Sequence, residues 1–114
     1  MDYQKLVEVI KRFNEERDWD QFHNIKDVAS AINIEASELQ ELFLWKKNGE
    51  LDILLESKRD AIESEVADIF AFLIIFCYKT NIDLEKVLLK KIEHNSSKYP
   101  VTKVKGSSKK YTEY

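Results

Sequence analysis

Two pairs of acidic residues have the types and spacing that could do chemistry in this sequence. Glu35 and Glu38 form one pair, Glu65 and Asp68 the other, and each pair is three residues apart. That spacing places both carboxylates of a pair on one side of a helix. Glu35 falls within the apolar stripe of its helix, and Asp68 is the only polar residue in 66–77. Burying an unpaired carboxylate costs on the order of several kcal/mol, so we expect four carboxylates that are directed into one core and hold a cation.

The ligand chemistry of this expected site favours a hard cation. Few Lys or Arg residues share the two acidic faces, so bases cannot neutralise all four carboxylates. Oxygen ligands with an incomplete shell suit Mg²⁺, with Mn²⁺ as the alternative, and leave room for water and phosphate oxygens. The pattern therefore indicates phosphate chemistry. The alternative is that these side chains are ionised residues at the edge of a core that reach out to water.

Composition and charge restrict the class of protein. The 114 residues are enough for one domain, and only two Gly and one Pro favour an all-α fold. A net charge of −3 argues against general nucleic-acid binding. The apolar run 66–77 is too short to span a bilayer, and the first residues carry charge without an apolar leader. A single cysteine, Cys77, fits a reducing compartment, so we expect a cytoplasmic protein.

Helical periodicity predicts a four-helix bundle. The second helix is expected to stop at Asn48 and Gly49, and Ser57 with Asp60 resembles a capping box that opens the third. The expected helices cover 3–16, 26–47, 57–79, and a segment that Asp83 caps and that fades near Pro100. We expect residues 1–100 to form the catalytic domain and 101–114 to form a basic tail.

Two segments suggest contacts beyond this bundle. The third expected helix is apolar nearly all round over 66–77, more than four short helices can cover, which predicts a homo-oligomer. The tail is either a solvated extension or a basic arm that closes over a bound triphosphate. Its charged and aromatic residues are Lys103, Lys105, Lys109, Lys110, Tyr111 and Tyr114.

Aromatic and basic residues near these elements are candidates for holding a nucleotide. Trp19, His23 and Trp45 offer flat surfaces or hydrogen-bonding edges, and Trp45 is expected on the same side of its helix as Glu38. Both Trp residues could instead be core or interface aromatics. The apolar stripe of the fourth helix ends in a group that could receive an anion or, alternatively, interact with the helix dipole. This group consists of Lys91, Asn95 and Lys98.

Taken in order, these motifs closely resemble the MazG-like nucleotide pyrophosphohydrolases, particularly the dCTP pyrophosphatase branch. The resemblance covers nearly the full chain and rests on Phe13, Glu16-Arg17-Asp18-Trp19, Gln21-Phe22-His23, Glu35-x-x-Glu38, Glu41-Leu42-Phe43, Trp45, Glu65-x-x-Asp68, Asp83-Leu84, Lys91, Asn95, Lys98-Tyr99-Pro100 and the ending 109–113. It implies an all-α bundle that assembles as a dimer or tetramer and hydrolyses nucleoside triphosphates to monophosphate and pyrophosphate with Mg²⁺.

The resemblance also implies roles for individual residues. It makes Glu35, Glu38, Glu65 and Asp68 magnesium ligands, with Glu38 also the base for the attacking water. The base pocket would be lined by Trp19, His23 and Trp45. Phosphate or sugar would be held by Lys91, Asn95, Lys98 and Tyr99.

Three departures from the family pattern bear on specificity. Ile25 replaces a frequent Pro, Leu44 replaces a frequent Gln, and Ser96-Ser97 replaces a more basic stretch. These leave the preferred base and the grip on phosphate open.

Features of the sequence distinguish a pyrophosphohydrolase from two alternative functions. A di-iron carboxylate bundle requires Glu-x-x-His pairs, and neither His23 nor His94 follows a Glu by three residues. The rival from another class is a non-catalytic helical interaction or regulatory module with a vestigial metal site. Such a module predicts disrupted acidic pairs, whereas all four carboxylates are present.

Overall fold

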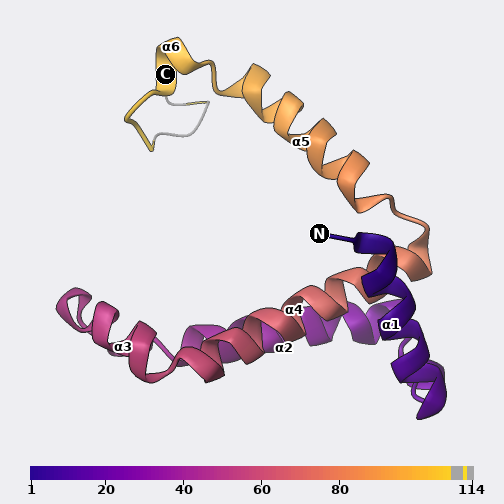
Figure 1. Ribbon diagram of the computed structural model, residues 1–114. Coiled ribbons are helices and arrows are strands. Elements are labelled where there is room, and N and C mark those ends of the chain that lie inside the picture. Colours follow the sequence, from indigo (N-terminus) through magenta and orange to yellow (C-terminus); the bar gives the residue numbers. More distant parts are fainter. Residues whose placement is uncertain (109–111, 113–114) are drawn as a thin grey trace. The chain divides into compact units, whose positions relative to one another are not determined.

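The computed structural model describes residues 1–108 and 112, and all regular elements in this part are helices (Figure 1). This confirms the predicted all-α class. The chain divides into two compact units, and the boundary between them in the sequence falls between Asn81 and Ile82. The first unit contains α1 (Tyr3–Glu16), η1 (Asp20–Phe22), α2 (Ile25–Glu41), η2 (Asn48–Glu50), α3 (Leu51–Ser57) and α4 (Arg59–Thr80). The second contains α5 (Leu84–Lys98) and α6 (Val101–Val104).

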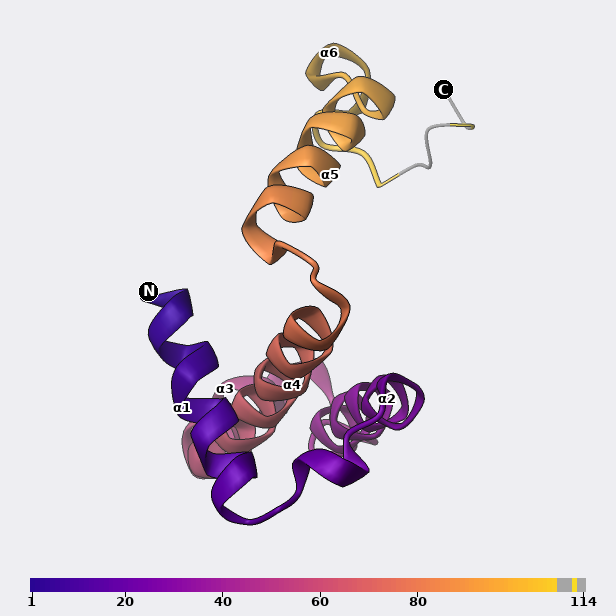
Figure 2. The same cartoon turned by 90° about the vertical axis from the view of Figure 1, so that its right-hand side faces the viewer.

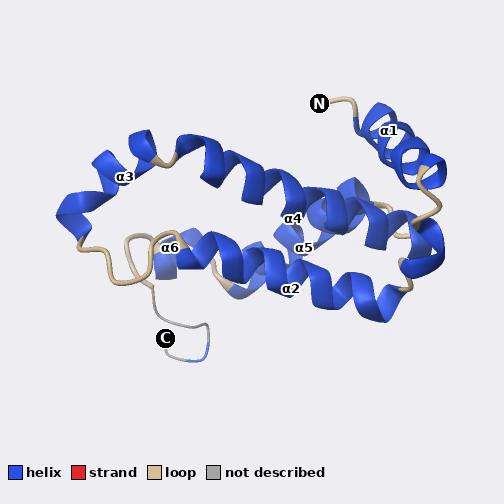
Figure 3. Ribbon diagram, turned by 90° about the horizontal axis from the view of Figure 1, so that it is seen from below, coloured by secondary structure: helices blue, strands red, loops and turns tan. Residues whose placement is uncertain are grey.

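An antiparallel pair of helices, α2 and α4, forms the centre of the first unit (Figure 3). Buried apolar side chains form the core of this unit, and among them Val28 on α2 and Ile74 on α4 are each only 1% exposed. Helix α1 packs against α4 on the side away from α2 (Figure 2). Because α2 and α4 carry one acidic pair each, their packing decides whether the four carboxylates meet.

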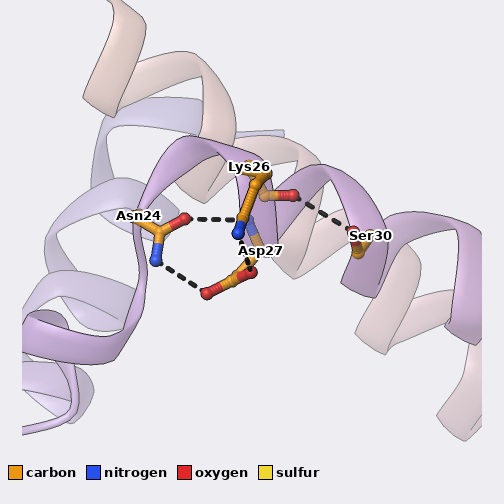
Figure 4. A network of polar contacts seen from close by, with 4 residues as sticks. All are labelled: Asn24, Lys26, Asp27 and Ser30. Atoms are coloured by element: carbon orange, nitrogen blue, oxygen red, sulfur yellow. Dashed lines mark hydrogen bonds and ion pairs between the residues drawn. The ribbon is translucent and has the colours of Figure 1, made fainter.

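A hydrogen-bonded cap fixes the start of α2 (Figure 4). The Asn24 side chain accepts from the backbone N–H of Asp27 at 2.9 Å and donates to the Asp27 carboxylate at 2.7 Å. Such a cap satisfies an N–H group that has no partner within the helix. It also sets the point where the loop containing His23 enters α2.

Helix α2 ends at Glu41, so the prediction that it continues to residue 47 was wrong. The next N–H groups bond three residues back, from Phe43 to Gln40 and from Leu44 to Glu41, and this tightens the chain into a turn. Trp45 then adopts the left-handed region with φ of 63°. The helical register that placed Trp45 beside Glu38 therefore does not extend to this residue.

The segment before α4 also differs from the prediction. Residues 51–57 form α3, which was not anticipated, and only Leu54 of this helix is buried. Ser57 is the last residue of α3, and α4 begins at Arg59 without a side-chain cap. The proposed capping box is therefore wrong, because Ser57 closes one helix instead of opening the next.

The second unit follows its prediction closely. The Asp83 carboxylate accepts from the N–H of Lys86 at 3.1 Å and caps α5, which ends at Lys98. In the segment predicted to be a tail, 101–104 form the short helix α6. The remaining tail residues named above, Lys109, Lys110, Tyr111 and Tyr114, lie outside the described residues. Among the helices described, none is long and apolar enough to cross a membrane.

Candidate active site

Three of the four predicted carboxylates meet where α2 packs on α4. Glu35 and Glu38 come from α2 and Glu65 comes from α4, and each offers an oxygen within 4.8 Å of the others. We call these three residues the acidic cluster. Asp68 lies one helical turn beyond Glu65 and is outside this set, but its charge acts on Glu35.

The four carboxylates differ in burial. Glu35 and Glu65 are half-buried, and each has one oxygen, Oε2, that is shielded from solvent without a hydrogen-bond partner. Glu38 and Asp68 are exposed, so the prediction that all four are directed into the core was wrong for these two. The cluster therefore has a buried side and a side that water or a ligand can reach.

Burial and crowding raise the pKa of Glu35 from 4.5 to about 7. Desolvation is the largest cause, hydrogen bonds with the Glu65 and Glu38 carboxyls come next, and the charges of Glu38 and Asp68 add to the effect. All of these favour the protonated form, because charge is costly in a poorly solvated and negatively charged place. No Lys, Arg or His forms an ion pair with these carboxylates within the described part of the chain.

This arrangement fits a divalent cation. The orphaned oxygens of Glu35 and Glu65 and the reachable carboxylate of Glu38 supply an oxygen-only set, which suits Mg²⁺ or Mn²⁺. A cation there would also offset the desolvation and the carboxylate repulsion that together favour the protonated form of Glu35. The residues that could hold it are the acidic cluster, with Asp68 beside them.

An apolar pocket of about 440 Å³ adjoins the acidic residues through Asp68. Helices α1 and α4 and the loop around η1 supply its walls, and almost all of its surface is hydrocarbon or aromatic. Its lining residues are Val9, Ile10, Phe13, Asn14, Trp19, His23, Asp68, Ala71, Phe72 and Ile75. A pocket of this kind, apolar with a few polar groups, is typical of small-molecule sites.

Aromatic contacts hold two predicted site residues in this pocket. The Trp19 ring packs edge-on against Phe13 with centroids 5.6 Å apart. The His23 ring packs edge-on against Phe72 at 6.2 Å. Such edge-to-face pairs are a preferred geometry for aromatic rings. Trp19 and His23 therefore reach the pocket by packing against α1 and α4 respectively.

Polar contacts fix the loop that carries Trp19 and His23. The backbone N–H of Trp19 donates to the backbone carbonyl of Asn14 at 2.9 Å. This hydrogen bond joins the start of the loop to the end of α1. Lys79 on α4 forms an ion pair of 2.8 Å with Asp20, and the Lys79 side chain is only 20% exposed. These contacts tie the loop to both helices that line the pocket.

The other predicted site residues are not among those that line this pocket. Trp45 is 90% exposed and is not part of the pocket. Lys91, Asn95 and Lys98 lie on α5, and Tyr99 follows at its C-terminal cap, so all four belong to the second unit. The roles given to these residues remain predictions.

Several pocket residues were not singled out from the sequence as site residues. They include Phe72 and Ile75, which read as ordinary core positions of α4, and Asn14 on α1. A signal for Asn14 existed, because it follows Val7 and Ile10 at helical spacing and so places a polar residue on the apolar face of α1.

Comparison with known proteins gives a consistent family assignment. Residues 30–114 match the MazG-like family. The chain is 37% identical over 103 residues to dCTP pyrophosphatase 1 of Homo sapiens, and 34% identical to that of Rattus norvegicus. Each match covers 89% of this chain and 61% of the relative, so the chain spans about three-fifths of their length. A crystal structure of a pyrophosphatase from Archaeoglobus fulgidus superimposes with a TM-score of 0.83 at 31% identity, covering 88% of this chain and 94% of that one.

Proposed function

Because this chain belongs to the MazG-like family of nucleoside triphosphate pyrophosphohydrolases, we propose that it is a Mg²⁺-dependent enzyme of this kind. It converts a deoxynucleoside triphosphate, dCTP or a modified dCTP, to the monophosphate and pyrophosphate, as a housecleaning activity on the nucleotide pool. The observation that carries this proposal is the acidic cluster, with its two buried and unpartnered carboxylate oxygens, beside an apolar pocket.

The acidic residues take two roles in this proposal. Glu35, Glu38 and Glu65, with Asp68, would hold Mg²⁺, which would supply neutralisation of charge on the triphosphate oxygens and on the leaving group. Glu38 also accepts the proton of the attacking water, a role that its exposure allows. Because the pocket begins at Asp68, a nucleotide whose phosphates lie at the acidic cluster can extend its base into the pocket.

The remaining residues bind the nucleotide. Trp19 and His23, which line the pocket, contact the base. Trp45 contributes a further flat surface to base binding. The phosphates or the sugar are held by Lys91, Asn95, Lys98 and Tyr99. The active form is a dimer or tetramer, in which α4 contributes to the interface.

The substrate preference rests on the relatives and on the pocket. Both relatives described above are dCTP pyrophosphatases. The pocket surface is mostly apolar, which suits a flat base and tolerates an apolar substituent at its 5-position.

The test compares pyrophosphate release from ribo-, deoxy- and 5-substituted nucleoside triphosphates with Mg²⁺. Glu38→Gln keeps the size of the side chain and removes the carboxylate that accepts the proton of the attacking water. Turnover should therefore fall by about 10²-fold or more, while the melting temperature should stay the same. Glu41→Gln is the matched control, because Glu41 is also an exposed carboxylate on α2 but lies outside the cluster. Near-normal turnover by Glu38→Gln would refute its role.

A second variant tests the site as a whole. Asp68→Asn removes the carboxylate that joins the acidic cluster to the pocket, and we expect it to abolish activity. Folded wild-type protein that binds Mg²⁺ but releases no pyrophosphate from any substrate would contradict the proposal and favour the non-catalytic interaction module.

A further inference from the structure

Two aromatic rings in the wall of the pocket are not held in place by burial. Phe13 and Trp19 both line the pocket, yet they are 44% and 45% exposed. Side chains as exposed as these keep rotamer freedom unless a specific contact restrains them, and ordering them when a ligand binds costs free energy. We call these two rings the aromatic wall. If the aromatic wall is to receive a flat ligand ring without that cost, another contact has to restrain it.

Backbone hydrogen bonds fix the position of the Trp19 backbone but leave its ring free to rotate. The N–H of Trp19 donates to the carbonyl of Asn14 at 2.9 Å, and the N–H of Asp18 donates to the carbonyl of Glu15 at 3.1 Å. Asp18 adopts the left-handed region with φ of 55°, as residues that follow the end of a helix often do. The Trp19 ring itself makes an edge-on contact with Phe13. The orientation of the Trp19 ring therefore depends on the position of the Phe13 ring.

The Arg17 side chain restrains Phe13 through two contacts. Its guanidinium lies over the Phe13 ring, with the central carbon 3.8 Å from the ring centroid. Its Nη1 also donates to the backbone carbonyl of Phe13 at 3.1 Å. That carbonyl belongs to the last turn of α1, where carbonyls lack a partner within the helix. An ion pair with Glu16 at 3.8 Å is longer than a hydrogen bond, so the close contacts of the guanidinium are those with Phe13.

Both contacts use properties that are particular to arginine. A planar guanidinium can stack on a ring while an N–H group in its plane donates to a carbonyl, whereas the lysine ammonium is a compact point charge without a plane to stack. Arg17 is not among the residues that line the pocket. Any effect of Arg17 on a ligand in the pocket must therefore pass through the aromatic wall.

We propose that Arg17 is a positioning residue for base binding, which holds the Phe13 ring, and through it the Trp19 ring, in the orientation that receives the base. The inference rests on the proposed function, because it assumes that the pocket holds the base of a nucleotide. Arg17 orients the aromatic wall before the substrate arrives, which reduces the ordering cost of binding. Contacts with the base hold the substrate and the transition state alike, so loss of Arg17 should raise KM and leave kcat nearly unchanged.

Two substitutions of Arg17 and one control separate the contributions. Arg17→Met removes the guanidinium and keeps a long unbranched side chain. Arg17→Lys keeps the charge but loses the planar stack, so it should recover only part of the wild-type behaviour, and it provides the same comparison should Met prevent folding. The matched control is Arg12→Met, because Arg12 is also an exposed arginine of α1 and lies outside the pocket lining.

The first measurement follows the indole N–H resonance of Trp19 by NMR in the metal-free protein without ligand. The neighbouring Phe13 ring shifts this resonance through its ring current. Trp19→Phe identifies the resonance against that of Trp45, the second tryptophan of the chain. We expect Arg17→Met to move the Trp19 resonance and to leave the Trp45 resonance in place, and we expect Arg12→Met to move neither.

The second measurement titrates the four common 2′-deoxynucleosides in EDTA, which reports on base binding without metal, phosphate or turnover. We expect the wild type to bind at least one nucleoside, and Arg17→Met to bind it about fivefold more weakly or worse. Arg17→Lys should lie between the two, and Arg12→Met should match the wild type. With triphosphates and Mg²⁺, the KM of Arg17→Met should rise by a similar factor, while kcat should change by less than about twofold.

Four results would overturn the inference. An unmoved Trp19 resonance in Arg17→Met would show that Arg17 does not hold the aromatic wall. A moved resonance with wild-type nucleoside affinity would show that the wall does not position the base. Equal losses in Arg17→Met and Arg12→Met would reduce the effect to the charge of α1. Absence of binding of every nucleoside by the wild type would show that the pocket holds no base.

Failure of the proposed enzyme would give a different result. Nucleoside binding that depends on Arg17, without pyrophosphate release from any triphosphate, would reject the proposed enzyme and retain the role of Arg17 in base binding.

Discussion

Binding of Mg²⁺ to the acidic cluster should release a proton, and the amount released should depend on pH in a defined way. Glu35 has a pKa of about 7 in the metal-free protein, because of its burial and its carboxylate neighbours. A ligand must be deprotonated to bind a cation, so the metal displaces the proton that Glu35 holds. With a pKa of about 7, we expect roughly nine-tenths of a proton released at pH 6, about half at pH 7 and about one-tenth at pH 8.

The proton on Glu35 also sets the apparent affinity of the acidic cluster for Mg²⁺. Competition between one proton and the metal makes the apparent Kd for Mg²⁺ about tenfold larger at pH 6 than at pH 8. Isothermal titration calorimetry in two buffers of different ionisation enthalpy measures both the affinity and the protons released. The titration belongs to the cluster as a unit, since the carboxyl groups of Glu65 and Glu38 both raise the pKa of Glu35.

Glu35→Gln is the control for this prediction. It removes the titrating carboxyl, so proton release should disappear and the weakened affinity should no longer change between pH 6 and pH 8. Equal affinity of the wild-type protein at both pH values, with no proton released at pH 6, would refute the assignment of the raised pKa to a metal-binding cluster.

In the absence of metal, the stability of the folded protein should depend on pH through the protonation of Glu35. The pKa of Glu35 is about 7 in the folded protein, and the ordinary value of a glutamate is 4.5. The folded chain therefore binds this proton more tightly than the unfolded chain does. The contribution of this group to stability is therefore fully present below pH 4.5 and is lost as pH rises to 7. In EDTA, the melting temperature should fall over this range relative to Glu35→Gln, and Mg²⁺ should restore it at the upper end.

Three further substitutions test how the fold supports the site. Lys79→Met removes the ion pair with Asp20, and we expect a loss of about 1 kcal/mol or less in unfolding free energy together with a raised KM, measured by urea denaturation and pyrophosphate release. Ile74→Ala leaves a cavity in the core beside α4 and should cost about 2–5 kcal/mol, whereas Val9→Ala, at a site that is 53% exposed, should cost much less. Asn24→Ala removes the cap of α2 and should cost about 1 kcal/mol by the same denaturation assay; an unchanged midpoint would contradict the importance of the cap.

The helix boundaries show where local sequence signals were sufficient. α1 and α5 have the predicted extents, and Asp83 forms the predicted cap, because capping and amphipathic spacing are local properties that neighbouring residues decide. The end of α2 and the existence of α3 were missed. The segment after Glu41 is apolar enough to read as a continued helix, and its turn and the left-handed conformation of Trp45 are not marked by Gly or Pro.

The sequence by itself determined the all-α class, the four acidic residues and the resemblance to a family, since all of these depend on residue types and on spacing within single helices. Only the tertiary structure decided that Glu35, Glu38 and Glu65 come together, that Glu38 and Asp68 remain exposed, and that Asn14 lines a pocket. These features depend on the packing of α2 and α1 against α4, which joins residues far apart in the chain. How far a carboxylate is buried, and hence how far its pKa is raised, follows from that packing, because desolvation depends on the neighbouring helices and not on the spacing of residues within one helix.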